Sequence, residues 1–244
     1  MSKVLVVIPY CAEGAQGNEL DLAVRGWRRH FKADFELVLV GDYAPVAFDT
    51  FIECPRITHR DDGNYIPHLD HVNKFLTVLR HYPDAEGFIY ACDDMYAVRD
   101  FTLDDVKRLK YLDDDMGGSL LSPNAWERDV AKTRNLCVYE GLPVRNYVCH
   151  LPIWYDRDKL MAIYKKYHCD YDSCVVEDIY FNTYYAGQEA DHVDKWRLGL
   201  NSTELSEDEL RERMKSVTWV TNSPLGWSEK LERVLAEHYN ERKD

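Results

Sequence analysis

The chain has 244 residues, of which 45% are hydrophobic and 13% aromatic, so it can fill the core of a large α/β domain. Its formal net charge of -13 argues against a surface built to neutralise nucleic-acid phosphates; a nucleic-acid partner is disfavoured but stays open, since a local basic patch is compatible with this charge. No apolar run approaches the ~20 residues that cross a bilayer, and seven cysteines without a CxxC pair indicate reduced thiols. We therefore expect a cytoplasmic protein without a transmembrane segment.

The first part of the chain alternates between strand and helix patterns. Residues 3–9 form a continuous apolar run, which predicts a central parallel strand. A helix with an apolar face follows over residues 20–31, and residues 35–40 and 50–54 are predicted as the next two strands. This alternation is typical of a parallel sheet with right-handed crossovers.

Several side chains near these strand ends are candidates for substrate binding. Pro9 and Tyr10 end the first strand, and the glycine-bearing loop after them can admit a nucleotide, although no GxGxxG fingerprint is present. Asp42 ends the second strand, where it suits a base or ribose edge and an ordinary turn equally well. Arg60 and Lys74 are candidates for phosphate contacts, with a solvated lysine as the alternative for Lys74.

The segment that organises the chain is a short apolar strand over residues 87–91, which leads to Asp93 and Asp94. Ligands of open α/β sheets bind at the carboxyl ends of strands. Two acids at such an end suit Mg²⁺ or Mn²⁺, which prefer hard oxygen ligands and clamp phosphate oxygens. The alternative is that both acids simply begin a solvated loop.

The second part of the chain has less regular patterns. We predict, in order, a helix over residues 103–112, a strand over 118–121, a helix that starts at Ser122–Pro123 and closes at Gly141, and a strand over 146–151. Helices over 157–167 and 177–187, a strand over 193–198, a charged helix that starts at the capping box of Ser206, a strand over 217–220 and a helix over 228–239 follow. No repeat, low-complexity tract or linker interrupts this series, so no domain boundary is predicted.

Three polar side chains in this part are candidates for chemistry. Glu177 and Asp178 stand at the start of a predicted helix, where carboxylates favour the positive end of the helix dipole. The functional alternative is that one of them faces the acid pair across a cleft and acts as a base. His192 is a candidate for an imidazole ligand of the cation, although most lone histidines are not ligands.

Four features then coincide: a first strand ending in Pro9–Tyr10, Asp42 after the second strand, an acid pair after a hydrophobic strand, and Glu177–Asp178 downstream. Together they resemble the nucleotide-sugar glycosyltransferases of the GT-A fold, in which a hydrophobic strand leads to a DxD-type motif. The matching segment here is Cys92–Asp94, in which Cys92 replaces the first acid.

The resemblance implies a single GT-A-like (Rossmann-like) domain over residues 1–244, with a mostly parallel central sheet flanked by helices and a smaller acceptor-side subregion. Residues 1–100 would form the nucleotide-binding half and residues 101–244 the acceptor-binding half. By the same resemblance Asp94 would be the principal ligand of Mn²⁺ or Mg²⁺, with Asp93 assisting or touching the sugar.

The activity implied is metal-dependent transfer of a hexosyl or pentosyl group from a nucleotide-diphosphate sugar, with a UDP-sugar as the expected donor. The acceptor would be the hydroxyl of a glycan or another molecule, deprotonated by Asp178 or Glu177 with inversion at the anomeric carbon. Three tryptophans are candidates for stacking on sugar rings, although isolated tryptophans more often belong to the core: Trp126, Trp154 and Trp196.

Three alternatives remain. Residues 18–27, 88–96 and 150–152 also resemble the Stealth capsule phosphotransferases, and a sugar-phosphate transferase of this kind would place His150 near the reacting phosphate. A non-catalytic domain that binds sugar nucleotides or another protein is the second alternative. The third is a glycosyltransferase that acts on modified DNA, although the excess of acidic residues counts against it.

Overall fold

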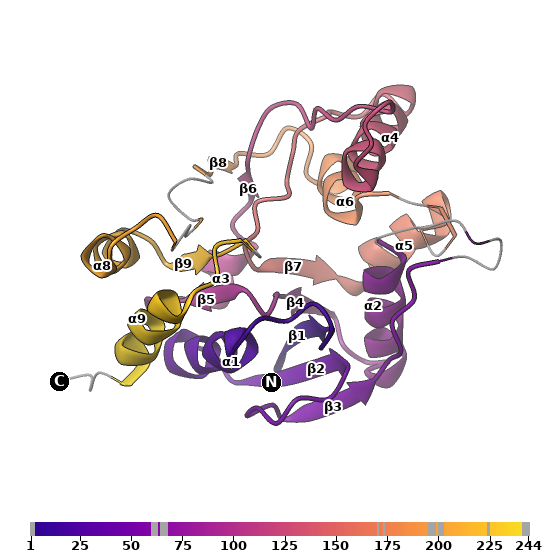
Figure 1. The fold of residues 1–244 in the computed structure, drawn as a ribbon. Coiled ribbons are helices and arrows are strands. Elements are labelled where there is room, and N and C mark those ends of the chain that lie inside the picture. Colours follow the sequence, from indigo (N-terminus) through magenta and orange to yellow (C-terminus); the bar gives the residue numbers. More distant parts are fainter. Residues whose placement is uncertain are drawn as a thin grey trace.

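Parallel strands form the centre of the computed structural model, which describes residues 3–59, 63, 68–169, 171–172, 174–194, 199, 203–223 and 225–240. The five-stranded sheet has the order β3-β2-β1-β4-β7 (Figure 1). Its strands are β1 (Val4–Tyr10), β2 (Phe35–Gly41), β3 (Thr50–Glu53), β4 (Gly87–Tyr90) and β7 (Ile153–Asp156). This arrangement confirms the predicted α/β class with a mostly parallel sheet flanked by helices.

Successive strands are added first on one side of β1 and then on its other side. The chain runs outwards from β1 through β2 to β3, all in parallel, and then returns to place β4 parallel to the other side of β1. The final strand, β7, pairs antiparallel with β4. The carboxyl ends of β1 and β4 therefore form a topological switch point, the place where open α/β sheets bind ligands.

Helices cover both faces of the sheet because both faces of its strands are apolar. On one face, α1 (Glu19–His30) packs Trp27 and other side chains against Val6 and Ile8. On the other face, α2 (Leu69–His81) packs Phe75 against Val7. The same layer continues with α5 (Arg157–Tyr167) and α6 (Val176–Tyr184) (Figure 1).

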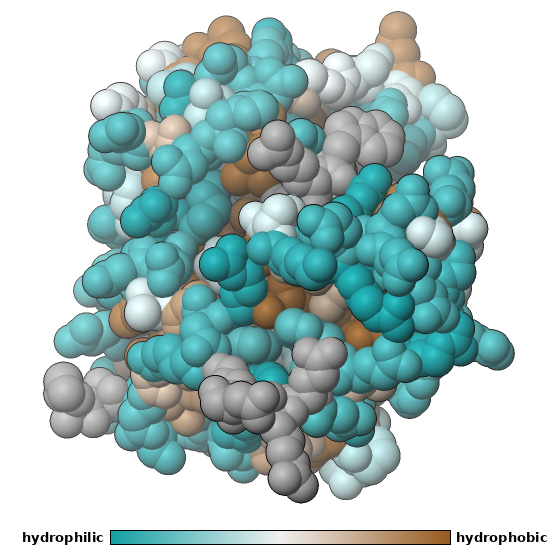
Figure 2. Space-filling model, turned by 90° about the vertical axis from the view of Figure 1, so that its left-hand side faces the viewer, coloured by the Kyte–Doolittle hydropathy of each residue, from teal (hydrophilic) through white to brown (hydrophobic). Residues whose placement is uncertain are grey.

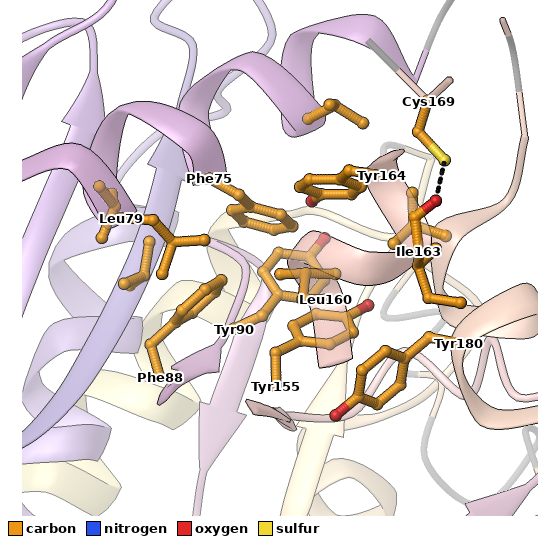
Figure 3. Close-up of a cluster of buried hydrophobic side chains, with 14 of the residues drawn as sticks. Phe75, Leu79, Phe88, Tyr90, Tyr155, Leu160, Ile163, Tyr164, Cys169 and Tyr180 are labelled. Atoms are coloured by element: carbon orange, nitrogen blue, oxygen red, sulfur yellow. Dashed lines mark hydrogen bonds between the residues drawn. The ribbon is translucent and has the colours of Figure 1, made fainter. Parts of the chain in front are cut away.

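An aromatic cluster joins this second layer to the sheet (Figure 3). The Phe75 ring of α2 lies 5.2 Å from the Tyr90 ring of β4, and the Tyr155 ring of β7 lies 5.0 Å from the Tyr180 ring of α6. The Tyr180 hydroxyl also accepts a hydrogen bond from the backbone N–H of Asp156 at 3.0 Å. These contacts fix the position of α6 relative to β4 and β7.

A smaller layer packs outside α1. It contains an antiparallel pair, β5 (Met95–Ala97) and β9 (Trp219–Thr221), together with α8 (Glu207–Ser216) and α9 (Glu229–Asn240). Their buried side chains form a separate core with Leu22 of α1. Hydrophilic residues cover most of the face over α8 and α9 (Figure 2). No helix in the described ranges has the length and apolar character needed to cross a bilayer.

The remaining elements lie above the sheet in the view of Figure 1, with α4 at the top. They are α3 (Leu103–Lys107), β6 (Lys110–Tyr111), α4 (Ala125–Tyr139) and β8 (Asp191–His192), with β6 and β8 pairing in parallel. The predicted helix over residues 103–112 was therefore too long, because its second part is β6. Residues 195–198 of the predicted strand over 193–198 lie outside the described residues.

Two predicted strands were wrong. Residues 118–121 form a turn, because Gly117 and Gly118 adopt left-handed φ values of 69° and 80° that strands do not use. Residues 146–151 are irregular apart from one bridge, and the strand comes later, as β7. There the Asn146 side chain accepts a hydrogen bond from the Val148 N–H at 2.9 Å, a local turn contact that competes with strand pairing.

Candidate functional site

A cavity of about 210 Å³ lies beside the carboxyl end of β4. Five separate parts of the chain line it: His68 and His71, Tyr90 and Cys92–Met95, Trp126, Val148–Leu151 with Ile153, and Glu177. The sheet brings these segments together because β4 and β7 are neighbours and α6 packs across them. The cavity is thus at the place where the topology predicts a ligand site.

Asp93 and Asp94 occupy the β4 end of this cavity. Burial raises the pKa of Asp93 to about 7, and the charge of Asp94 adds to the effect. Burial also raises the pKa of Asp94 to about 7, with the charge of Glu19 adding. Oδ1 of Asp94 is buried and has no hydrogen-bond partner among the described residues. Two adjacent carboxyl groups that are costly to ionise, one with an oxygen that accepts no hydrogen bond from the described residues, fit a divalent cation.

Protein side chains alone do not make a complete metal site here. Within the described ranges, no three His, Cys, Asp or Glu side chains form a group that could hold a metal ion. One or two carboxylates completed by water and phosphate oxygens are the usual way in which proteins hold Mg²⁺. The residues present therefore fit a cation that arrives with a phosphate-bearing substrate.

The loop after β1 lies on the same edge of the sheet. Burial raises the pKa of Tyr10, and the charges of Asp93 and Asp42 add to it, so the phenol lies within electrostatic range of both acids. Oδ2 of Asp42 accepts a hydrogen bond from the Ala12 N–H at 2.8 Å, which ties the loop to the end of β2. Pro9 precedes Tyr10 within β1, where it pairs with Val40 of β2.

Lys74 is buried beneath this edge. Its Nζ donates to Oδ2 of Asp70 at 2.6 Å and to the Tyr10 carbonyl oxygen at 3.2 Å. Oδ1 of Asp70 in turn accepts from the Ile57 N–H at 3.1 Å. Lys74 is not among the residues that line the cavity. Lys74 therefore links α2 to the end of β1 through these hydrogen bonds.

Lys74→Ala is expected to lower the free energy of unfolding by about 3–5 kcal/mol, because it leaves a buried carboxylate without its cation. Chemical denaturation measures the loss. The double variant Asp70→Asn/Lys74→Met removes both charges and keeps an acceptor for the Ile57 N–H, so it is expected to lose less. A double variant as unstable as Lys74→Ala would show that packing, and not the unpaired charge, sets the cost.

The two acids of α6 take different positions. Glu177 lines the cavity, whereas Asp178 is fully buried behind it. Oδ1 of Asp178 accepts a hydrogen bond from the Tyr147 N–H at 2.6 Å, and its Oδ2 has no partner in the described part of the chain. Burial raises the pKa of Asp178 to about 8, with the charge of Glu177 adding, so its carboxyl group is mostly protonated at neutral pH.

Asp178 is joined by Asn182 one helical turn later. The Asn182 side chain accepts from the Arg145 N–H at 3.2 Å and donates to the Arg145 carbonyl oxygen at 2.7 Å. Together these two side chains hold the irregular segment that leads into Val148–Leu151, part of the cavity wall. The geometry gives Asp178 a positioning role, and it leaves Glu177, whose pKa burial also raises, as the acid of this pair that lines the cavity.

Of the three remaining residues that the sequence suggested for the site, one lines the cavity. His150 lines the cavity and has a left-handed backbone with φ of 54°. His192 is exposed on β8, where its ring packs 5.3 Å from the Tyr111 ring, and it is not a lining residue. Arg60 lies outside the described residues.

The structure adds residues that the sequence analysis did not assign to the site. His68 and His71 line the cavity from the start of α2, and their spacing of three residues on a helix was the available signal. Glu19 lies near the acid pair, and its Oε1 accepts from Nδ2 of Asn222 at 2.7 Å. The Asn222 Oδ1 accepts from the Tyr96 hydroxyl at 2.7 Å, which links α1, β5 and the residue after β9.

No protein-family model and no curated protein sequence matches the chain. Among solved structures, the glycosyltransferase GlyE of Streptococcus pneumoniae TIGR4 is similar over 99% of this chain and 61% of its own, with 12% sequence identity and a TM-score of 0.39. A glycosyltransferase involved in the glycosylation of the major capsid of PBCV-1 is similar over 98% of this chain and 100% of its own, with 10% identity and a TM-score of 0.41. The chain thus spans about 61% of the length of GlyE.

Proposed function

We propose that the protein transfers a hexosyl or pentosyl group from a nucleotide-diphosphate sugar, with a UDP-sugar as the first candidate, to an acceptor hydroxyl in the presence of Mg²⁺ or Mn²⁺. The observation that carries the proposal is the convergence of Asp93, Asp94 and Glu177 on one cavity beside the switch point of the sheet. Acids at one end of the cavity suit a cation with its diphosphate, and a separate acid from another element suits an incoming hydroxyl.

The sugar-nucleotide donor would bind at the carboxyl ends of β1 and β4. Nucleotides bind at such switch points because strand ends leave a crevice between the neighbouring loops. The loop after β1, with Tyr10 near Asp93 and Asp42, borders this crevice. Asp94, assisted by Asp93, would hold the cation; when bound, it offsets the negative charge that develops on the leaving diphosphate.

Glu177 is the proposed base for the acceptor hydroxyl. Its carboxylate accepts the proton of the acceptor hydroxyl as the oxygen attacks the anomeric carbon, which breaks the bond to the diphosphate and inverts the configuration. A raised pKa suits this role because it makes the carboxylate a stronger base. The fixed position of α6, held by the Tyr180 contact to Asp156, keeps the carboxylate in place.

A second candidate function is transfer of a sugar phosphate, which His150 in the same cavity favours. In that reaction an imidazole beside the reacting phosphorus would assist the transfer, and the nucleotide product would be a monophosphate. Glycosyl transfer leaves a nucleoside diphosphate. Identification of the nucleotide product by ion-exchange chromatography separates the two.

A panel of nucleotide sugars with Mn²⁺ tests the proposal. At a free ligand concentration of 100 times Kd, the matching donor is expected to stabilise the fold by about 2.7 kcal/mol and to raise Tm by roughly 5–10 °C. The rise should disappear when a chelator replaces Mn²⁺, and sugar phosphates without a nucleoside should have little effect. A panel in which no nucleotide sugar raises Tm, with or without metal, would contradict the proposal.

A further inference from the structure

One part of the cavity wall consists of aromatic and imidazole rings. His68 and His71 come from the start of α2, and Trp126 comes from the first turn of α4. The rings of His68 and Trp126 lie 4.7 Å apart, and the ring of His71 lies 5.7 Å from that of Tyr90. Neither imidazole has a place in the transfer chemistry described above.

At this wall, one polar atom of His68 has no partner in the part of the chain that the structure describes. The residue is 7% exposed, and its Nε2 has no hydrogen-bond partner among the described residues. The Asp129 Oδ2 atom lies 4.0 Å away, beyond hydrogen-bond distance. Because a buried polar atom without a partner is costly, a polar group from a ligand would be stabilised beside it.

Both imidazoles are neutral at physiological pH. Burial lowers the pKa of His68 to about 4, with His71 also lowering it and Asp129 opposing. Burial likewise lowers the pKa of His71 to about 4, although the charge of Asp70 opposes the shift. A neutral imidazole offers one donor and one acceptor, the pairing that a hydroxyl group needs.

The size and charge of the cavity restrict the ligand further. At about 210 Å³ it is below the roughly 300–1,000 Å³ that holds drug-sized ligands, so it has room for one ring and not for a whole nucleotide. Asp93, Asp94 and Glu177 make it unfavourable for an anion that brings no cation. Trp126 is 40% exposed and offers the flat apolar surface that matches the C–H face of a sugar.

We propose that His68, His71 and Trp126 form a subsite for one uncharged sugar ring, which stacks on the indole and places hydroxyl groups on the two imidazoles. The inference rests on the proposed function, in which such a ring comes either from the donor or from the end of the acceptor. Hexuronic acids and sugars with free phosphate groups are excluded from the subsite.

Kinetics with Trp126→Ala, and with Trp126→Phe as the matched control, test this subsite. Trp126→Ala is expected to raise KM at least about tenfold for the substrate whose ring occupies the subsite, whereas Trp126→Phe keeps an aromatic face and should lose much less. A change in acceptor KM assigns the ring to the acceptor, and a change in donor KM assigns it to the donor. Affinity for the free nucleoside diphosphate with Mn²⁺ should stay unchanged in both variants.

A comparison of substrates with different sugar rings tests the subsite independently. The hexose form of the relevant substrate should be used at least about tenfold better than the corresponding hexuronic acid, because the carboxylate would meet acids and neutral imidazoles. Equal use of both forms, or an unchanged KM for both substrates in Trp126→Ala, would overturn the inference while leaving glycosyl transfer intact.

Failure of the proposed function is recognised separately, as absence of any nucleotide-sugar binding or turnover. In that case saturation-transfer NMR with neutral methyl glycosides decides the subsite directly. Contacts to the sugar protons in the wild type that are lost in Trp126→Ala would support it, and no contacts in the wild type would refute it. Chemical denaturation of each variant checks that the fold is retained.

Discussion

Glu177→Gln is expected to lower kcat for sugar transfer by about 10²–10⁴-fold, with little change in the affinity for nucleotide and Mn²⁺. Glutamine has nearly the same shape but cannot accept the proton of the attacking hydroxyl. The structure places this side chain in the cavity wall, on a different element from the acid pair, so its replacement leaves the β4 end unchanged. Steady-state kinetics and nucleotide binding by calorimetry measure the two quantities.

The neighbouring acid supplies the matched control. Asp178→Asn should retain most of the activity, because the carboxyl group is already mostly neutral at pH 7 and the amide oxygen can still accept from the Tyr147 N–H. If Asp178→Asn abolished transfer while Glu177→Gln did not, the assignment of the base to Glu177 would be wrong.

Asp94→Asn is expected to lower kcat/KM by about 10³-fold and to remove the dependence on Mn²⁺, because a cation on the leaving diphosphate contributes several kcal/mol to the rate. Activity measured over a range of Mn²⁺ concentrations checks both parts. Asp208→Asn is a suitable control, since the Asp208 side chain is 99% exposed on α8. Full activity of Asp94→Asn at every Mn²⁺ concentration would rule out a metal role for this residue.

The same substitution should stabilise the metal-free fold. Burial raises the pKa of Asp94 to about 7, and its Oδ1 has no hydrogen-bond partner among the residues that the structure describes, so its ionised form is disfavoured when the protein is folded. A carboxyl group with a raised pKa stabilises the fold fully below its unfolded pKa near 4, and this stabilisation is lost as the pH rises through 7. Asp94→Asn should therefore be more stable than the wild type by about 1–3 kcal/mol at pH 8 in chelator.

Lowering the pH provides the internal check. The advantage of Asp94→Asn should shrink as the pH falls from 8 towards 4, because the wild-type carboxyl group then takes up a proton in the folded state. Urea denaturation at several pH values measures it. An advantage that does not change with pH would mean that a raised pKa of Asp94 is not its cause.

The sequence was informative where elements are buried on both sides. The apolar runs that became β1 and β2 have little choice of structure, because only the interior of a sheet covers both of their faces. The segment before β7 was mispredicted for a local reason, since the Asn146 turn contact and the left-handed His150 prevent strand pairing there. Such effects depend on single side chains and leave hydrophobic periodicity unchanged.

The site was only partly predictable. The pair Glu177–Asp178 marks the first turn of a helix, but successive helical side chains point about 100° apart, and only the packing of α6 decides which one faces the cavity. His68 and Trp126 are more than fifty residues apart in the sequence, and their contact depends on how the fold brings the first turn of α4 to the start of α2. No local pattern encodes such a contact, because it arises from the topology of the whole chain.

The side chain of Asn222 joins a late part of the chain to an early one. The residue follows β9, and its side chain reaches back 203 residues to Glu19 at the start of α1. A nascent chain can therefore pair β1 to β4 while still lacking the anchor for the loop that precedes α1. This edge of the sheet gains its final support only when β9 has been synthesised and has paired with β5, so the cavity beside β4 should reach its final form late in folding.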